Sequence, residues 1–173
     1  DQNLETFPVT NVFGRQFSTY RYIDVNGEKI LLVYPTMGAA GAVCDMELLI
    51  ASGINKIVAF GTCGRLDKNI AQNTIILPTA AYREEGTSYH YLPESDEVEV
   101  DSDAFKICND IFNKNGFTTV SGKIWTTDAV YRETPGKVAL MKSRGCVGVE
   151  MELSALLALA KYRNIKFTEF LIG

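Results

Sequence analysis

The chain has 173 residues, which is enough for one domain with a core that folds without disulfide or metal staples. Its formal net charge of -4, with no long basic run, argues against nucleic-acid binding, and no apolar stretch reaches the length that spans a membrane. The single histidine excludes a metal site built from several histidines, and four widely separated cysteines indicate reduced thiols in a cytoplasmic protein.

The first part of the chain predicts a β-hairpin followed by a helix. Aromatic and β-branched residues over 16–25 favour a strand, and residues 29–34 favour the strand that returns beside it. Asn26-Gly27 between them is typical of a type I′ turn. We expect a helix over residues 39–52, because apolar side chains recur there at helical spacing before Gly53.

The next stretch predicts the strand around which the chain is organised. Residues 57–60 are consecutive apolar residues rich in β-branched side chains, which predicts a strand buried on both faces. The strand stops at Gly61-Thr62-Cys63-Gly64. Two glycines around a hydroxyl residue at the end of a strand favour either the close approach of an anionic ligand or a tight turn with a buried threonine.

The rest of the chain alternates strands with helices, which predicts an α/β layered fold. We expect strands at 73–81 (interrupted by Pro78), 117–127, 146–149 and 165–173, and helices at 102–115, after Thr134-Pro135 and from Glu150 onwards. Residues 82–91 have no apolar face but hold three tyrosines and His90, so they favour either a ligand or subunit contact or an exposed crossover. The acidic run over 94–103 is typical of a solvated face.

Glu150-Met151-Glu152 is the second candidate feature. Two carboxylates flank a thioether where an apolar strand is expected to lead into a helix. The helix dipole accounts for one acid at this place but not for both. A carboxylate here can accept two hydrogen bonds from a sugar diol while the methionine packs against the sugar ring.

Taken together, these motifs resemble a known family. Gly61-Thr62-Cys63-Gly64, the Arg-Glu-Glu-Gly-Thr-Ser run at 83–88 and Val149-Glu150-Met151-Glu152 resemble the nucleoside phosphorylases, which include uridine phosphorylase and the small-subunit purine nucleoside phosphorylases. The resemblance implies a three-layer α/β/α sandwich with a mixed central sheet, as a single domain over residues 1–173 that lacks N- and C-terminal parts. It also implies a pentosyltransferase of nucleoside salvage, which splits a nucleoside with phosphate into ribose 1-phosphate and free base and needs no cofactor or metal.

The resemblance further implies roles for individual residues. Gly61, Thr62 and Arg15 would bind phosphate, with Arg15 donated by the neighbouring subunit of a homo-oligomer. Glu152 would hold the ribose hydroxyls and, with Thr62 and Arg15, would be catalytic. The remaining substrate contacts that it implies are Cys63, Gly64, Val130, Tyr131, Glu150 and Met151.

One departure from the family leaves alternatives open. The family carries an arginine two residues before the first glycine of the Gly-Thr turn, where this chain has Ala59. Water in place of phosphate, as in a nucleosidase, is therefore one alternative, unless Arg65, Arg83 or an arginine expected in a missing part of the protein replaces the missing charge. A nucleoside-binding relative without turnover is another. Residues 83–86 slightly favour a uridine-type over a purine-type substrate.

Overall fold

The computed structural model of the chain describes residues 6–8 and 19–173. Its contacts divide the chain into two compact units, residues 1–37 and residues 38–173, which are described separately. A single domain over the whole chain stays a prediction. No helix within the described residues is long and apolar enough to cross a membrane.

The first unit holds a three-stranded antiparallel sheet in the order β1 (Thr6–Pro8), β2 (Thr19–Val25) and β3 (Glu28–Val33). Asn26 and Gly27 have positive φ values of 56° and 85°, as a type I′ turn requires. The Gly27 N–H donates to Asp24 Oδ1 at 2.8 Å. The predicted hairpin is confirmed, although residues 16–18 of its expected first strand lie outside the described residues.

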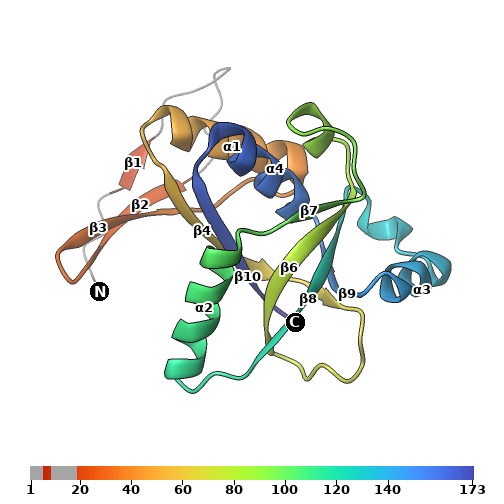
Figure 1. Cartoon of the computed structure of the whole chain (residues 1–173). Helices are drawn as coiled ribbons and strands as arrows, with labels where there is room; N and C mark the ends of the chain where they lie inside the picture. The colour runs from red at the N-terminus through yellow and green to blue at the C-terminus, as the bar shows by residue number, and fades with distance from the viewer. Residues whose placement is uncertain (1–5, 9–18) are drawn as a thin grey trace. The chain divides into compact units, whose positions relative to one another are not determined.

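The second unit is built on a seven-stranded mixed sheet (Figure 1). The main path runs β4 (Lys56–Thr62), β10 (Lys166–Ile172), β6 (Ile75–Glu84), β8 (Thr119–Thr127), β9 (Cys146–Glu150) and β5 (Gly64–Arg65), and β7 (Glu97–Glu99) pairs with β6. The β4–β10, β6–β8 and β8–β9 pairs are parallel, whereas β10–β6, β9–β5 and β6–β7 are antiparallel.

Successive residues of β10 show how helices cover both faces of this sheet. Phe167 and Leu171 are buried in one core with α1 (Ala39–Ala51) and α4 (Leu153–Arg163). Phe170 points to the opposite face and packs against Phe112 of α2 (Ser102–Lys114), with ring centroids 5.2 Å apart. A further helix, α3 (Pro135–Ser143), packs against β9. The mixed sheet between helices confirms the predicted α/β/α layering.

Side-chain caps fix where two of the helices begin. Thr134 accepts a hydrogen bond from the Lys137 N–H, and Pro135 occupies the first turn of α3, as predicted. Asp101 accepts from the amides of residues 103 and 104 and begins α2. The acidic run at 94–103 therefore includes β7 and a helix cap, in addition to solvated residues. Two short 3₁₀ helices, η1 (Ser88–His90) and η2 (Val130–Arg132), complete the unit.

The expectation that residues 57–60 form a strand buried on both faces is wrong. β4 ends the strand order of the seven-stranded sheet, and Val58 and Phe60 are 62% and 67% exposed. Phe60 stacks on Phe170 of the adjacent strand at 5.7 Å, but no described helix covers it. A continuous apolar run indicates that both faces of a strand are apolar, and the residues that the structure describes cover only one of them.

The loop expected over residues 82–91 begins later than predicted. β6 passes Pro78 with a register shift between Pro78 and Ala80 and continues to Glu84. Proline has no N–H to donate, so the strand pairing slips at this point and then resumes.

Candidate active site

The candidate site lies where β9 ends and α4 begins. Glu150 closes β9, and its Oε2 accepts hydrogen bonds from the N–H groups of Glu152 and Leu153 at 2.6 and 2.8 Å. Its Oε1 accepts from the Thr126 hydroxyl at 2.6 Å, and the Thr126 oxygen in turn accepts from the Ser154 N–H at 3.0 Å. The Glu150 side chain therefore caps the first turn of α4 and fixes the path of the chain through Met151 and Glu152.

Burial is the main influence on the ionisation of Glu150. It raises the pKa of this carboxyl from 4.5 to about 7. The hydrogen bonds from Thr126 and from the amides of Glu152 and Leu153 act against burial and lower this pKa, whereas the charge of Glu152 raises it. Glu150 thus carries a proton for part of the time near neutral pH.

Glu152 links the beginnings of two helices. Its Oε1 accepts a hydrogen bond of 2.5 Å from the N–H of Gly38, the residue before α1. Gly38 has a φ of 90°, which favours glycine, so the backbone can turn there to direct its N–H at the carboxylate. Within the described residues Glu152 Oε2 accepts no hydrogen bond. One carboxylate oxygen is thus fixed by the fold, and the expected contact of Glu152 with ribose hydroxyls stays a prediction. Met151 beside it is partly exposed.

Glu169 of β10 adds a third carboxyl to those of Glu150 and Glu152. Burial raises the pKa of Glu169 well above 4.5, and the charges of Glu150 and Glu152 raise it further. Its Oε2 atom is buried and has no hydrogen-bond partner within the described residues. We call Glu150, Glu152 and Glu169 the acidic cluster. Nowhere in the described part of the chain do three or more His, Cys, Asp or Glu side chains form a group suited to a metal ion.

The Gly61–Gly64 turn lies at the end of β4. Alternation along the strand places Thr62 on the exposed face with Val58 and Phe60. Burial raises the pKa of the Cys63 thiol to about 11, and the charges of Glu150 and Glu169 contribute to this rise. Cys63 therefore lies close enough to the acidic cluster to respond to its charge. The Cys63 N–H donates to the carbonyl of Ile172 at 3.0 Å and is therefore not available to an anion. A shared cavity for Thr62 and Glu152 stays a prediction.

The two glycines of the turn differ in their surroundings. A Cβ added at Gly64 would lie 2.9 Å from Val149 Cγ1, so the pairing of β5 with β9 itself requires glycine there. A Cβ at Gly61 would meet Leu171 Cδ2 at 3.8 Å, an ordinary contact. Close packing thus explains Gly64 without a ligand, and the proposed ligand contacts of both glycines stay predictions.

Arg83 is held by the loop that follows it. Its guanidinium donates to the Ser88 hydroxyl at 2.8 Å, to the Pro93 carbonyl at 2.7 Å and to Ser95 Oγ at 2.7 Å, and it lies 4.0 Å from the Tyr89 ring centroid. The residue is buried. Its donors are therefore occupied by the loop, and Arg83 does not replace the charge missing at position 59.

The second arginine considered for this purpose, Arg65, is also engaged. Its Nη1 donates to the carbonyl of Ile70 at 2.6 Å. It does lie near enough to Cys63 for its charge to lower the pKa of that thiol, against the larger effects of burial and the two glutamates. Arg65 is thus a neighbour of the turn, and one of its terminal nitrogens is already bonded to the loop after β5.

A buried hydrogen-bond path joins the loop after β6 to the acidic cluster. Glu85 accepts from the Ser88 N–H at 2.9 Å and from the Ser154 hydroxyl at 2.8 Å. The Ser154 N–H donates to Thr126, whose hydroxyl donates to Glu150. The loop therefore helps to fix the first turn of α4, and its contact with a ligand or a neighbouring subunit stays a prediction.

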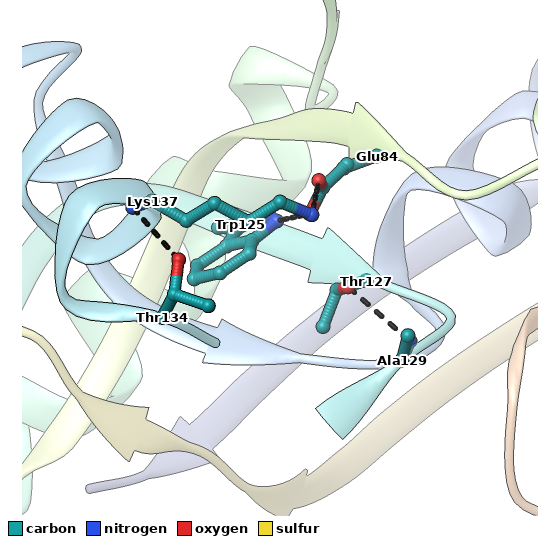
Figure 2. Close-up of polar contacts among 6 residues, drawn as sticks. All are labelled: Glu84, Trp125, Thr127, Ala129, Thr134 and Lys137. Carbon is teal, nitrogen blue, oxygen red and sulfur yellow. Dashed lines mark hydrogen bonds and ion pairs between the residues drawn. The ribbon is translucent and has the colours of Figure 1, made fainter. Parts of the chain in front are cut away.

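Polar contacts also anchor the carboxyl end of β8 (Figure 2). Trp125 is fully buried and donates from Nε1 to Glu84 Oε2 at 2.7 Å, while Lys137 Nζ pairs with the other oxygen of the same carboxylate. Thr127 Oγ1 accepts from the Ala129 N–H at 3.3 Å, just before η2. These contacts hold the end of β8 and the residues that lead into η2.

Val130 and Tyr131 are exposed on η2. Tyr131 is 98% exposed and Val130 is 48% exposed, so the described residues leave both side chains largely uncovered. Their expected position beside the base stays a prediction. Arg15, the expected phosphate ligand from a neighbouring subunit, lies outside the described residues.

Comparison with known proteins agrees with this arrangement. The family model for the phosphorylase superfamily matches residues 1–172. The chain belongs to the phosphorylase superfamily. It is 32% identical over 118 residues to a purine nucleoside phosphorylase DeoD-type from Clostridium novyi, which covers 67% of this chain and 51% of the relative. It is 27% identical over 154 residues to purine nucleoside phosphorylase DeoD-type 1 from Shewanella oneidensis, which covers 88% of this chain and 64% of the relative.

Two solved structures share the fold of this phosphorylase-superfamily chain. An AMP nucleosidase from Bacteroides thetaiotaomicron matches with a TM-score of 0.82 and 25% identity over 98% of this chain and 71% of that chain. A purine nucleoside phosphorylase from Toxoplasma gondii in complex with immucillin-H matches with a TM-score of 0.86 and 24% identity over 99% and 68%. The predicted fold class is confirmed. The chain spans about half to two thirds of the length of the two curated relatives named above.

The superfamily motifs led to Glu150 and Glu152, but sequence reasoning missed Glu169, Thr126 and Glu85. A charged residue on the same face as Phe167 and Leu171 of a strand was the available signal for Glu169. Thr126 carried no such signal, and the run at 83–88 that contains Glu85 gave no sign of its bond to Ser154, because these partners lie 24 and 69 residues away in the chain.

Proposed function

We propose that this protein breaks the N-glycosidic bond of a purine nucleoside and transfers the ribosyl group to phosphate. The observation that carries this proposal is the Glu152 carboxylate, which the fold fixes through one oxygen at the beginnings of α1 and α4 and leaves open at the other. Superfamily membership and relatives named as purine nucleoside phosphorylases support the reaction class and the base.

The chemistry suits this carboxylate. As the C1′–N bond breaks, its electron pair goes to the base and the ribosyl group develops oxocarbenium character, which a nearby negative charge stabilises. Glu152 Oε2 accepts hydrogen bonds from the ribose hydroxyls and so orients C1′ toward the acceptor. An oxygen of hydrogen phosphate then forms the new bond to C1′, and the proton that the phosphate carried goes through solvent to the departing base, which gives ribose 1-phosphate and the free base.

The slight preference for uridine that residues 83–86 suggested has no support in these comparisons. The curated relatives named above are purine nucleoside phosphorylases. Arg83 and Glu85, which belong to that run, are occupied within the loop and with α4. We therefore propose a purine base.

Water is the second candidate acceptor, and two observations favour it. Position 59 is alanine, where the resemblance to the family implies an arginine whose charge would favour phosphate. The chain is also similar in structure to an AMP nucleosidase. A hydrolytic reaction would give free ribose in place of ribose 1-phosphate.

Base release separates these possibilities. Inosine, adenosine and uridine are incubated with the protein, with and without phosphate, and the free base is quantified. We expect release from the purine nucleosides that requires phosphate and that is lost in Glu152→Ala but kept in Glu94→Ala, a change at an exposed glutamate. Equal release with and without phosphate would show that water is the acceptor, and no release from any nucleoside would refute the proposed reaction.

We also propose that the active form is a homo-oligomer in which Arg15 completes the site of a neighbouring copy. Arg15→Ala and Glu152→Ala are each expected to lack activity. In a mixture that exchanges subunits between dimers, about a quarter of the sites combine an intact Arg15 with an intact Glu152. Activity that returns on mixing supports donation between subunits, whereas an inactive mixture of exchanged subunits contradicts it.

A further inference from the structure

Glu169 is a carboxyl in a place where the fold otherwise puts apolar side chains. On β10 it lies between Phe167 and Leu171 on the face of the sheet that packs against α1 and α4, and both of those neighbours are buried. Across the parallel pair its register partner is Ala59 of β4, which contributes only a methyl group. Of the paired residues Glu169 and Ala59, only Glu169 has a polar side chain, and this pair lies just before the Gly61–Gly64 turn that follows along β4.

The groups around Glu169 favour its neutral form. Glu150 at the end of β9 and Glu152 before α4 both raise the pKa of Glu169, in addition to burial, and Cys63 of the turn is close enough to respond to its charge. The buried acid of α1, Asp45, is not among the groups that shift the pKa of Glu169. A further negative charge is thus disfavoured here, which favours the neutral, protonated form of Glu169.

A protonated carboxyl is a hydrogen-bond donor, and this one has no acceptor within the described residues. Its Oε2 atom is buried and unpartnered, which is costly unless a ligand or water supplies the partner. Two of the hydrogen-bond donors considered for binding an anion are already occupied. The Cys63 N–H donates to the carbonyl of Ile172, and Arg83 donates within its loop. The part of the site that would bind phosphate therefore lacks hydrogen-bond donors, and the neutral carboxyl of Glu169 can supply one.

We propose that Glu169 is part of the phosphate subsite and donates a hydrogen bond from its neutral carboxylic acid to a phosphate oxygen. This inference rests on the proposed phosphorolysis and names a residue of that site which neither the motifs nor the comparisons assign. Ionisation of Glu169 removes the donor and places a negative charge against the anion. Phosphate therefore binds with Glu169 protonated, and its apparent affinity falls as pH rises through the pKa of Glu169.

The test compares the KM for inorganic phosphate over a pH series in the unaltered protein, Glu169→Gln and Glu169→Leu. The glutamine amide keeps a donor that does not ionise, so the KM of Glu169→Gln at pH 6 stays within about threefold of the unaltered protein. Loss of one hydrogen bond to an anion raises the KM of Glu169→Leu about tenfold or more. Glu94→Gln serves as the matched control at an exposed glutamate and leaves the KM unchanged.

The pH series separates Glu169 from phosphate itself, whose own ionisation affects all variants alike. The ratio of the KM of the unaltered protein to that of Glu169→Gln is expected to rise with pH. Calorimetry of inorganic phosphate binding to the unaltered protein, in two buffers of different ionisation enthalpy, should show net proton uptake above the pKa of Glu169.

Two outcomes would overturn the inference while leaving phosphorolysis intact. One is a KM ratio that does not change with pH together with no proton uptake, and the other is a Glu169→Leu variant that folds and keeps the original KM. Either would mean that Glu169 is satisfied by water alone. Absence of phosphate-dependent base release in the unaltered protein is a separate failure, that of the proposed reaction.

Discussion

Replacing Glu150 with alanine removes the acceptor of three hydrogen bonds at the beginning of α4. The Leu153 N–H and the Thr126 hydroxyl are buried donors, and the Glu152 N–H is partly buried. A buried donor left without an acceptor costs about 1–3 kcal/mol, and removing the buried carboxyl offsets part of that cost. We therefore expect the free energy of unfolding to fall by about 3 kcal/mol in Glu150→Ala.

The neighbouring change Glu152→Ala is the matched comparison. It leaves one partly buried donor, the Gly38 N–H, without its acceptor, which predicts a loss of about 1 kcal/mol. Base release per folded molecule, in contrast, should fall to background, because the ribose hydroxyls lose the carboxylate proposed to bind them.

Urea denaturation at constant pH measures both free energies, provided that the denaturant slope is the same in each variant. Base release is then normalised to the folded fraction. The reasoning is refuted if Glu152→Ala destabilises the protein as much as Glu150→Ala does, or if Glu152→Ala keeps full activity per folded molecule.

Three further predictions follow from other contacts. The pKa of Glu150 is about 7 in the folded chain against 4.5 for the free group, so the folded state binds this proton more tightly. The free energy of unfolding should therefore fall as pH rises between these two values. Urea titrations should show a flatter pH dependence in Glu150→Gln, and an unchanged dependence would contradict the raised pKa of Glu150. Arg83→Met should lower the free energy of unfolding by about 2–4 kcal/mol, because several buried acceptors lose their donor; limited proteolysis should then cut within residues 84–95, and resistance equal to that of the unaltered protein would count against it. Gly122→Ala places a Cβ 2.5 Å from Val147 Cγ1 and should cost about 1–3 kcal/mol; a double-mutant cycle with Val147→Ala should show a favourable coupling energy, whereas strict additivity would exclude the clash.

Features determined within a few residues could be predicted from the sequence. Asn26-Gly27 predicted the hairpin because only a few residue types adopt positive φ at both central positions of a type I′ turn, and Thr134-Pro135 predicted the beginning of α3 for similarly local reasons. Glu150 and Glu152 could be named as candidate site residues because the helix dipole explains only one of two carboxylates at a strand-to-helix junction.

The environment of β4 and of Glu169 could not be predicted in this way. Whether an apolar strand is covered on one face or two depends on its place in the strand order, and β4 pairs with β10, more than 100 residues away in the chain. The same pairing sets Glu169 beside Ala59 and near Glu150. A local pattern can mark Glu169 as unusual within its strand, but it carries no information on which strands pair or which side chains then lie together.

The three carboxyls of the acidic cluster differ in how far the fold satisfies them, and this difference separates structural from functional residues. Glu150 accepts hydrogen bonds from three donors, so its loss should affect stability first. Glu152 accepts from one donor and keeps one oxygen open, whereas Glu169 has a buried oxygen with no partner among the described residues. A buried polar group without a hydrogen-bond partner lowers the stability of the fold. Such a group is expected where a bound ligand supplies the missing partner. Substitution should therefore lower the free energy of unfolding most at Glu150, less at Glu152 and least at Glu169. The effect of substitution on ligand binding should increase in the same order.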